Sequence, residues 1–80
     1  MSKEKIDVCV RESLAAYFKD LDGVAPHKLY EMMLTCFERP LLETVMEKAS
    51  DNQSKAAQWL GLNRNTLHKK LVEHGLLKDD

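Results

Sequence analysis

The sequence predicts an all-α fold: a four-helix subunit with a proline-kinked central helix and a C-terminal helix-turn-helix, paired into an intertwined homodimer. Apolar residues recur at helical spacing through residues 3–50, in a chain of only 80 residues. Residues 52–75 hold two alanines, a glycine and two leucines in the order expected of two short helices that cross at a tight turn. We expect one domain over residues 1–80, in which residues 3–50 form the dimerisation helices and residues 52–75 the helix-turn-helix.

The first helix is expected from Lys3 to Leu21. Asp22-Gly23 should end this helix, and Pro26 suits the first turn of the next one. The apolar residues that define it recur at steps of four, four, three, one and three, and they are Ile6, Val10, Leu14, Tyr17, Phe18 and Leu21.

The central helix is expected from about His27 to Ala49 and is the apolar centre of the chain. Its apolar residues cover much more than one stripe, and a helix of that kind must be buried on most sides. The rest of so small a chain cannot cover it, so we expect two copies to pack across a two-fold axis. A compact monomeric four-helix domain is the alternative.

Pro40 falls inside the central helix. Proline removes one backbone donor and clashes with the preceding turn, so we expect a bend near Glu38–Pro40. A break into two separate helices is the alternative. The apolar register that continues from Met33 to Met46 favours a bend.

The helix-turn-helix is predicted from small and apolar residues. Ala56 and Ala57 are small enough for a second helix to cross closely. Gly61 can adopt the positive φ that ends a helix and turns the chain. Asn52 and Asn63 are good N-caps for the two helices.

The second helix of the motif should present a polar face. At 100° per residue, Leu67 and Leu71 share the inner side. A helix with this arrangement is typical of one that enters the major groove of DNA, although an ordinary helical hairpin with solvated lysines is the alternative. The opposite sector holds Asn65, Thr66, Lys69 and Glu73, with Arg64 and His68 at its border.

Charge is distributed unevenly along the chain. The net charge is −1, but residues 1–49 carry seven Lys/Arg against nine Asp/Glu, a balance of −2. Residues 50–78 carry five Lys/Arg against two Asp/Glu, a balance of +3, and Asp79 and Asp80 complete the total. The positive charge therefore coincides with the predicted motif, where phosphate would lie.

Other classes of function find no support in the sequence. Cys9 and Cys36 form no CxxC pattern and are expected to be a reduced, semi-buried pair, and the histidines lack ligand spacing, so we expect no metal and no cofactor. No nucleophile with an oriented base or paired-carboxylate pocket is indicated, so we expect no enzyme. No membrane-length apolar run or signal-peptide core occurs, which predicts a cytoplasmic protein that does not interact with membranes.

Over nearly its whole length the chain resembles Fis, the bacterial factor for inversion stimulation. The resemblance implies an all-α homodimer whose two recognition helices are closer than successive major grooves, so that bound DNA bends. It also implies a nucleoid-associated regulator of transcription whose further partners are RNA polymerase or a recombinase. The matching stretches are Tyr17-Phe18, Leu29-Tyr30-Glu31, Pro40-Leu41-Leu42, Asn52-Gln53, Ala56-Ala57, Gly61-Leu62-Asn63-Arg64, Thr66-Leu67, Lys69-Lys70-Leu71 and Gly75.

The resemblance also implies a set of DNA-binding side chains. Arg64 is the best candidate for a guanine, because its planar fork suits O6 and N7. The expected contacts are Asn52, Ser54 and Lys55 from the first motif helix, and Asn63, Arg64, Thr66, Lys69 and Lys70 from the second.

Three departures from the family pattern modify this expectation. The predicted first helix begins almost at the first residue, so we expect the chain to lack the N-terminal arms that contact invertases in the family and not to stimulate inversion. His68 stands where a basic residue is common, and Val72-Glu73 replaces a lysine pair. We expect weaker binding than that of the more basic members. The alternative function is a helical protein-interaction dimer with a weak or vestigial helix-turn-helix.

Overall fold

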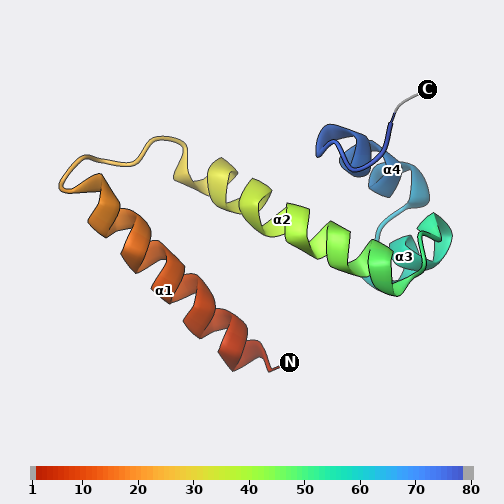
Figure 1. The fold of residues 1–80 in the computed structure, drawn as a ribbon, viewed down its shortest axis with the longest axis horizontal. Helices are drawn as coiled ribbons and strands as arrows, with labels where there is room; N and C mark the ends of the chain where they lie inside the picture. The colour runs from red at the N-terminus through yellow and green to blue at the C-terminus, as the bar shows by residue number, and fades with distance from the viewer. Residues whose placement is uncertain (1, 79–80) are drawn as a thin grey trace.

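The computed structural model describes residues 2–78 as four α-helices, with no strand within that range. They are α1 (Lys3–Leu21), α2 (Leu29–Lys48), α3 (Gln53–Leu60) and α4 (Arg64–Glu73) (Figure 1). The predicted all-α class is confirmed. Figure 1 shows that α1 and α2 diverge from the loop that joins them, while α3 and α4 fold back beside the C-terminal end of α2.

Local sequence accounts for the bounds of α1. The Ser2 hydroxyl accepts a hydrogen bond from the Lys5 amide at 3.2 Å and caps the helix. Asp22 ends it in the left-handed conformation at φ 49°, and Gly23 follows at φ 87°. The predicted bounds, Lys3 to Leu21, are confirmed.

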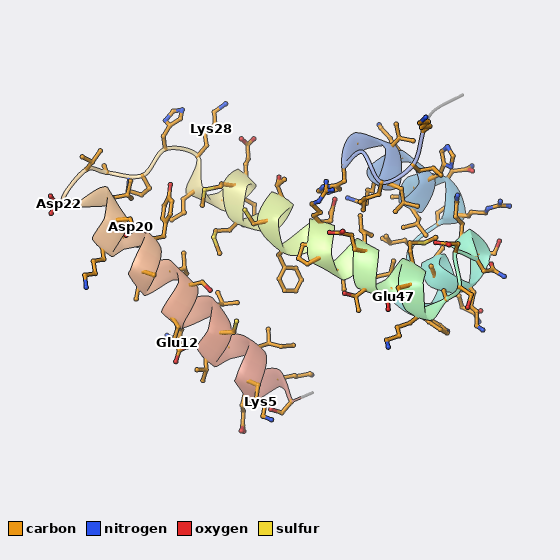
Figure 2. All side chains as sticks on the ribbon, in the orientation of Figure 1. Lys5, Glu12, Asp20, Asp22, Lys28 and Glu47 are labelled. Atoms are coloured by element: carbon orange, nitrogen blue, oxygen red, sulfur yellow. The ribbon has the colours of Figure 1, made fainter. Side chains whose placement is uncertain are left out.

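The start of α2 was predicted wrongly. The helix begins at Leu29, and Pro26 lies before it rather than in its first turn. Lys28 has φ 50° and ψ 42°, a left-handed conformation that a right-handed helix cannot include. Asp22 and Lys28 lie near the two ends of the connecting loop (Figure 2).

Pro40 lies inside α2, which is a single helix from Leu29 to Lys48. The alternative of two separate helices is therefore wrong. The bend at Glu38–Pro40 stays a prediction.

The buried core lies entirely in the C-terminal half of the chain. No residue of α1 is buried, whereas α2, α3 and α4 pack against one another. Apolar burial is the main favourable term in folding, and in this structure it comes from the C-terminal half. The core residues are all at most 3% exposed, and they are Leu42, Ala49, Ala56, Ala57, Leu67 and Leu71.

Polar contacts also join α2 to α4. The Glu38 carboxylate lies 2.9 Å from Lys70 Nζ and, through its other oxygen, 2.9 Å from His74 Nε2. The Arg39 guanidinium donates to the backbone carbonyl of His74. Hydrogen bonds from Lys70 and His74 hold the pKa of Glu38 below its ordinary value, because they favour the charged carboxylate.

Leu67→Ala should remove about 2–5 kcal/mol of stability, because it opens a cavity in a fully buried site. Chemical unfolding at one fixed protein concentration measures the loss. Thr66→Ala is the matched control, since Thr66 is the exposed neighbour on the same helix. Equal stability losses for the two variants would contradict the packing described here.

Acidification should weaken the contribution of Glu38 to stability. A carboxyl group whose folded-state pKa is depressed stabilises the fold above its unfolded-state pKa, and this stabilisation is lost as the pH falls through the folded-state pKa. The difference in melting temperature between wild type and Glu38→Gln should therefore shrink between about pH 7 and about pH 3. The effect is limited by solvent screening, since the side chain is 30% exposed. A constant difference over this range would show that the Glu38 charge contributes nothing.

Candidate nucleic-acid interface

A side-chain N-cap begins each of the two helices α3 and α4. The side-chain Oδ1 of Asn52 accepts from the Lys55 backbone amide at 3.0 Å, and the side-chain Oδ1 of Asn63 accepts from the Asn65 backbone amide at 2.8 Å. Both predicted N-caps are confirmed. Each cap uses the side-chain amide oxygen, so the NH₂ group of each asparagine can still donate a hydrogen bond to a phosphate oxygen.

The turn between the helices depends on Gly61. This residue has φ 74°, and the following amide, that of Leu62, donates to the Ala57 carbonyl at 2.9 Å. A side chain at Gly61 would meet nothing within 4 Å, so the requirement for glycine is conformational. Gly75 closes α4 in the same way at φ 70°, as its place in the sequence suggested.

The two faces of α4 are those that the sequence predicts. Leu67 and Leu71 are 0% and 2% exposed and pack on the core of the C-terminal half. The side opposite these leucines faces solvent. The exposed residues of α4 are Arg64, Asn65, Thr66, His68, Lys69 and Glu73.

Most of the predicted DNA contacts are exposed. Within residues 2–78, neither Arg64 nor Lys69 takes part in an ion pair, so both charges are free to meet an anion. Seven of the eight predicted site residues are exposed, and they are Asn52, Ser54, Lys55, Asn63, Arg64, Thr66 and Lys69.

Two further contacts shape the surface. The Lys55 ammonium lies 5.4 Å from the centre of the Trp59 ring, within the range of a cation–π interaction. Trp59 is 53% exposed. His68 Nδ1 lies 3.3 Å from Gln53 Oε1, which links α4 to the start of α3. No sequence pattern pointed to a role for Trp59 or Gln53, although Trp59 follows Lys55 by one helical turn.

Lys70 differs from the other predicted contacts. Its ammonium is held by Glu38 of α2, and its side chain is 31% exposed. Sequence reasoning missed Glu38. The one available signal was the four-residue spacing of Lys70 and His74, which places two donors on the same side of α4.

Other kinds of site are not formed by the described residues. Within residues 2–78 no group of three His, Cys, Asp or Glu side chains is placed to hold a metal ion. The same part of the chain has no helix of the length and apolarity that a membrane span requires. Cys9 and Cys36 are both exposed and unbonded, so the expected semi-buried state is wrong for the single chain, where α1 packs on nothing that could cover Cys9.

Comparison with known proteins agrees with this geometry. Residues 34–74 match the family described as "Bacterial regulatory protein, Fis family". The chain is 61% identical to a Fis-like DNA-binding protein of Ralstonia nicotianae over 77 residues, which are 96% of this chain and 100% of that one. It is 57% identical to a Fis-like DNA-binding protein of Neisseria meningitidis serogroup B over 90% of this chain and 91% of that one.

More distant relatives carry the family name itself. The DNA-binding protein Fis of Proteus mirabilis is 45% identical over 67 residues, which are 84% of this chain and 68% of that protein. The family match over residues 34–74 includes the α3–α4 pair that carries the exposed cations. On the combined strength of the helix-turn-helix geometry and these identities, the chain belongs to the Fis family of bacterial regulatory proteins.

Proposed function

We propose that the protein is a homodimer that binds and bends double-stranded DNA, acting as a nucleoid-associated protein and transcription regulator in the cytoplasm. The observation that carries the proposal is the division of α4 into two faces. Leu67 and Leu71 fix the helix to the core, while Arg64 and Lys69 stand exposed and without ion-pair partners among the described residues. A short helix held in this way can enter the major groove and read base edges.

The side chains divide between reading bases and holding the backbone. Arg64 lies in the first turn of α4, the part of a recognition helix that reaches the bases, and its guanidinium can contact guanine O6 and N7 together. Phosphate contacts position the protein on the duplex without reading sequence. We assign them to Asn52, Ser54, Lys55, Asn63, Thr66 and Lys69.

Dimerisation is supported by the uncovered apolar side of α2. Tyr30, Leu34, Phe37 and Leu41 follow one another at steps of four, three and four, and they are 78%, 51%, 51% and 39% exposed. Residues at these steps share one side of a helix. A second copy of the same chain presents the same stripe, as a two-fold interface requires. We propose that α1 and α2 of two subunits cover each other there.

DNA bending follows from the family resemblance and this dimer. Two recognition helices fixed on one dimer core reach two half-sites, and DNA must bend if the helices are closer than one turn of the duplex. RNA polymerase or a recombinase would then be a further partner on the bent DNA.

The alternative is a protein-interaction dimer with a vestigial helix-turn-helix. The observations that favour it are the exposed Glu73 on α4 and the engagement of Lys70 by Glu38. A salt titration separates the two functions. With Lys55 and Lys69 in each subunit on phosphates, about four phosphates are neutralised per dimer, and log K should fall with log[salt] at a slope of about −4. A dimer that shifts no duplex even at low salt would support the alternative.

Arg64→Ala should flatten sequence preference, costing about 1–3 kcal/mol on the preferred site and little on others. Lys69→Ala is the matched comparison, because it should weaken all sites alike and reduce the salt slope by about two per dimer. Fluorescence-anisotropy titrations on a panel of duplexes measure both effects. A uniform loss with Arg64→Ala would contradict base reading by this residue.

Leu34→Glu should convert the dimer to a monomer, because it places a charge in the proposed interface. Light scattering gives the mass. Thr35→Glu is the control, since it adds the same charge about 100° around α2. An unchanged dimer mass for Leu34→Glu would exclude this stripe as the interface.

A further inference from the structure

Two kinds of contact hold α4 on α2. The first is apolar: Leu42 of α2 lies in the same buried cluster as Leu67 and Leu71 of α4. Apolar contacts are non-directional, so this cluster fixes the separation of the helices better than their angle. The second contact is polar and directional, and it comes from Glu38, four residues before Leu42 on α2.

The geometry at Glu38 is that of a two-point clamp. One carboxylate oxygen takes the Lys70 ammonium and the other takes the His74 ring nitrogen, each at 2.9 Å. The two donors are four residues apart, so they span the last turn of α4. Arg39, the next residue of α2, donates to the His74 backbone carbonyl at the same helix end. A change in the angle between α4 and α2 that pivots on Leu67 and Leu71 would break these bonds while leaving much of the apolar contact in place.

We propose that Glu38 is a positioning residue that sets the angle of the recognition helix on the central helix. The DNA consequence rests on the proposed function: if α2 belongs to the dimer core, Glu38 fixes the orientation of each α4 relative to the two-fold axis. Glu38 thereby controls how strongly the affinity of the dimer depends on the ease with which the DNA bends. The main partner of the Lys70 ammonium is then Glu38 and not a DNA phosphate.

Loss of the clamp and a simple charge effect predict different changes in DNA binding. Glu38→Gln removes a negative charge and releases Lys70, so electrostatics alone predicts tighter binding to every duplex and a steeper salt slope. Loss of the clamp instead predicts poorer discrimination between duplexes with an easily compressed and a resistant centre. A uniform gain in affinity with an unchanged ratio between the duplexes therefore indicates the charge effect alone, whereas a lower ratio indicates loss of the clamp.

The test compares duplexes with identical flanks and either an AT-rich or a GC-rich centre. Glu38→Gln should lower the ratio of the two affinities about threefold to tenfold. Glu47→Gln is the matched control: Glu47 is exposed near the C-terminal end of α2 (Figure 2), and its replacement changes the net charge equally. The control should leave the ratio unchanged. His74→Gln, which keeps an N–H donor, should retain the ratio, whereas His74→Ala should lose it.

A measurement without DNA keeps the inference independent of the proposed function. Residual dipolar couplings of the free protein report the orientation of α4 relative to α2, and circular dichroism confirms that each variant is folded. Reorientation or disorder of α4 in Glu38→Gln but not in Glu47→Gln supports the clamp, even if wild type binds no duplex. Identical orientation in Glu38→Gln and wild type overturns it. Failure of wild type to bind any duplex overturns the proposed function alone.

Discussion

The close crossing of α3 and α4 is the constraint on which the rest of the structure depends. Ala56 and Ala57 are 0% and 3% exposed, and they leave room for Leu67 and Leu71 to reach the same core. Gly61 makes the crossing possible, since it turns the chain at φ 74° without a side chain that would oppose that conformation. The polar side chains of α4 other than Lys70 are exposed, because Leu67 and Leu71 turn the opposite side of the helix to the core. The surface that we propose for DNA binding is thus a consequence of how the opposite surface packs.

The N-terminal half depends on a different constraint: one chain has too few residues to cover its apolar side chains. A chain of 80 residues buries a limited share of its surface, and here the buried residues all come after Pro40. Helix α1 and the first half of α2 carry apolar side chains that a single subunit leaves uncovered. The proposed dimer would cover these side chains and would join two recognition helices in one particle. Stability and DNA recognition would then share α2, through its apolar stripe on one side and through Leu42 and Glu38 on another.

The sequence allowed prediction of features that depend on neighbours along the chain. The bounds of α1, the asparagine caps, the turn at Gly61 and the two faces of α4 follow from spacing within one or two helical turns. The start of α2 was missed because nothing in the sequence marks Lys28 as left-handed. The Glu38–Lys70 pair was missed for a deeper reason. Its members are 32 residues apart, and their meeting depends on how α4 lies on α2. For the same reason, the sequence lists the basic residues but does not show which of them already form an ion pair within the protein.

The central claim is that the two-faced α4 helices of a dimer bind DNA and bend it. Fluorescence resonance energy transfer between dyes at the two ends of an AT-rich-centre duplex tests this claim most directly. Saturation with the protein should raise the transfer efficiency, because a bend brings the ends together. The Leu34→Glu variant should leave the efficiency low if two subunits are needed. Saturated binding with no change in efficiency would contradict the account, since the duplex would then be straight under a bound protein.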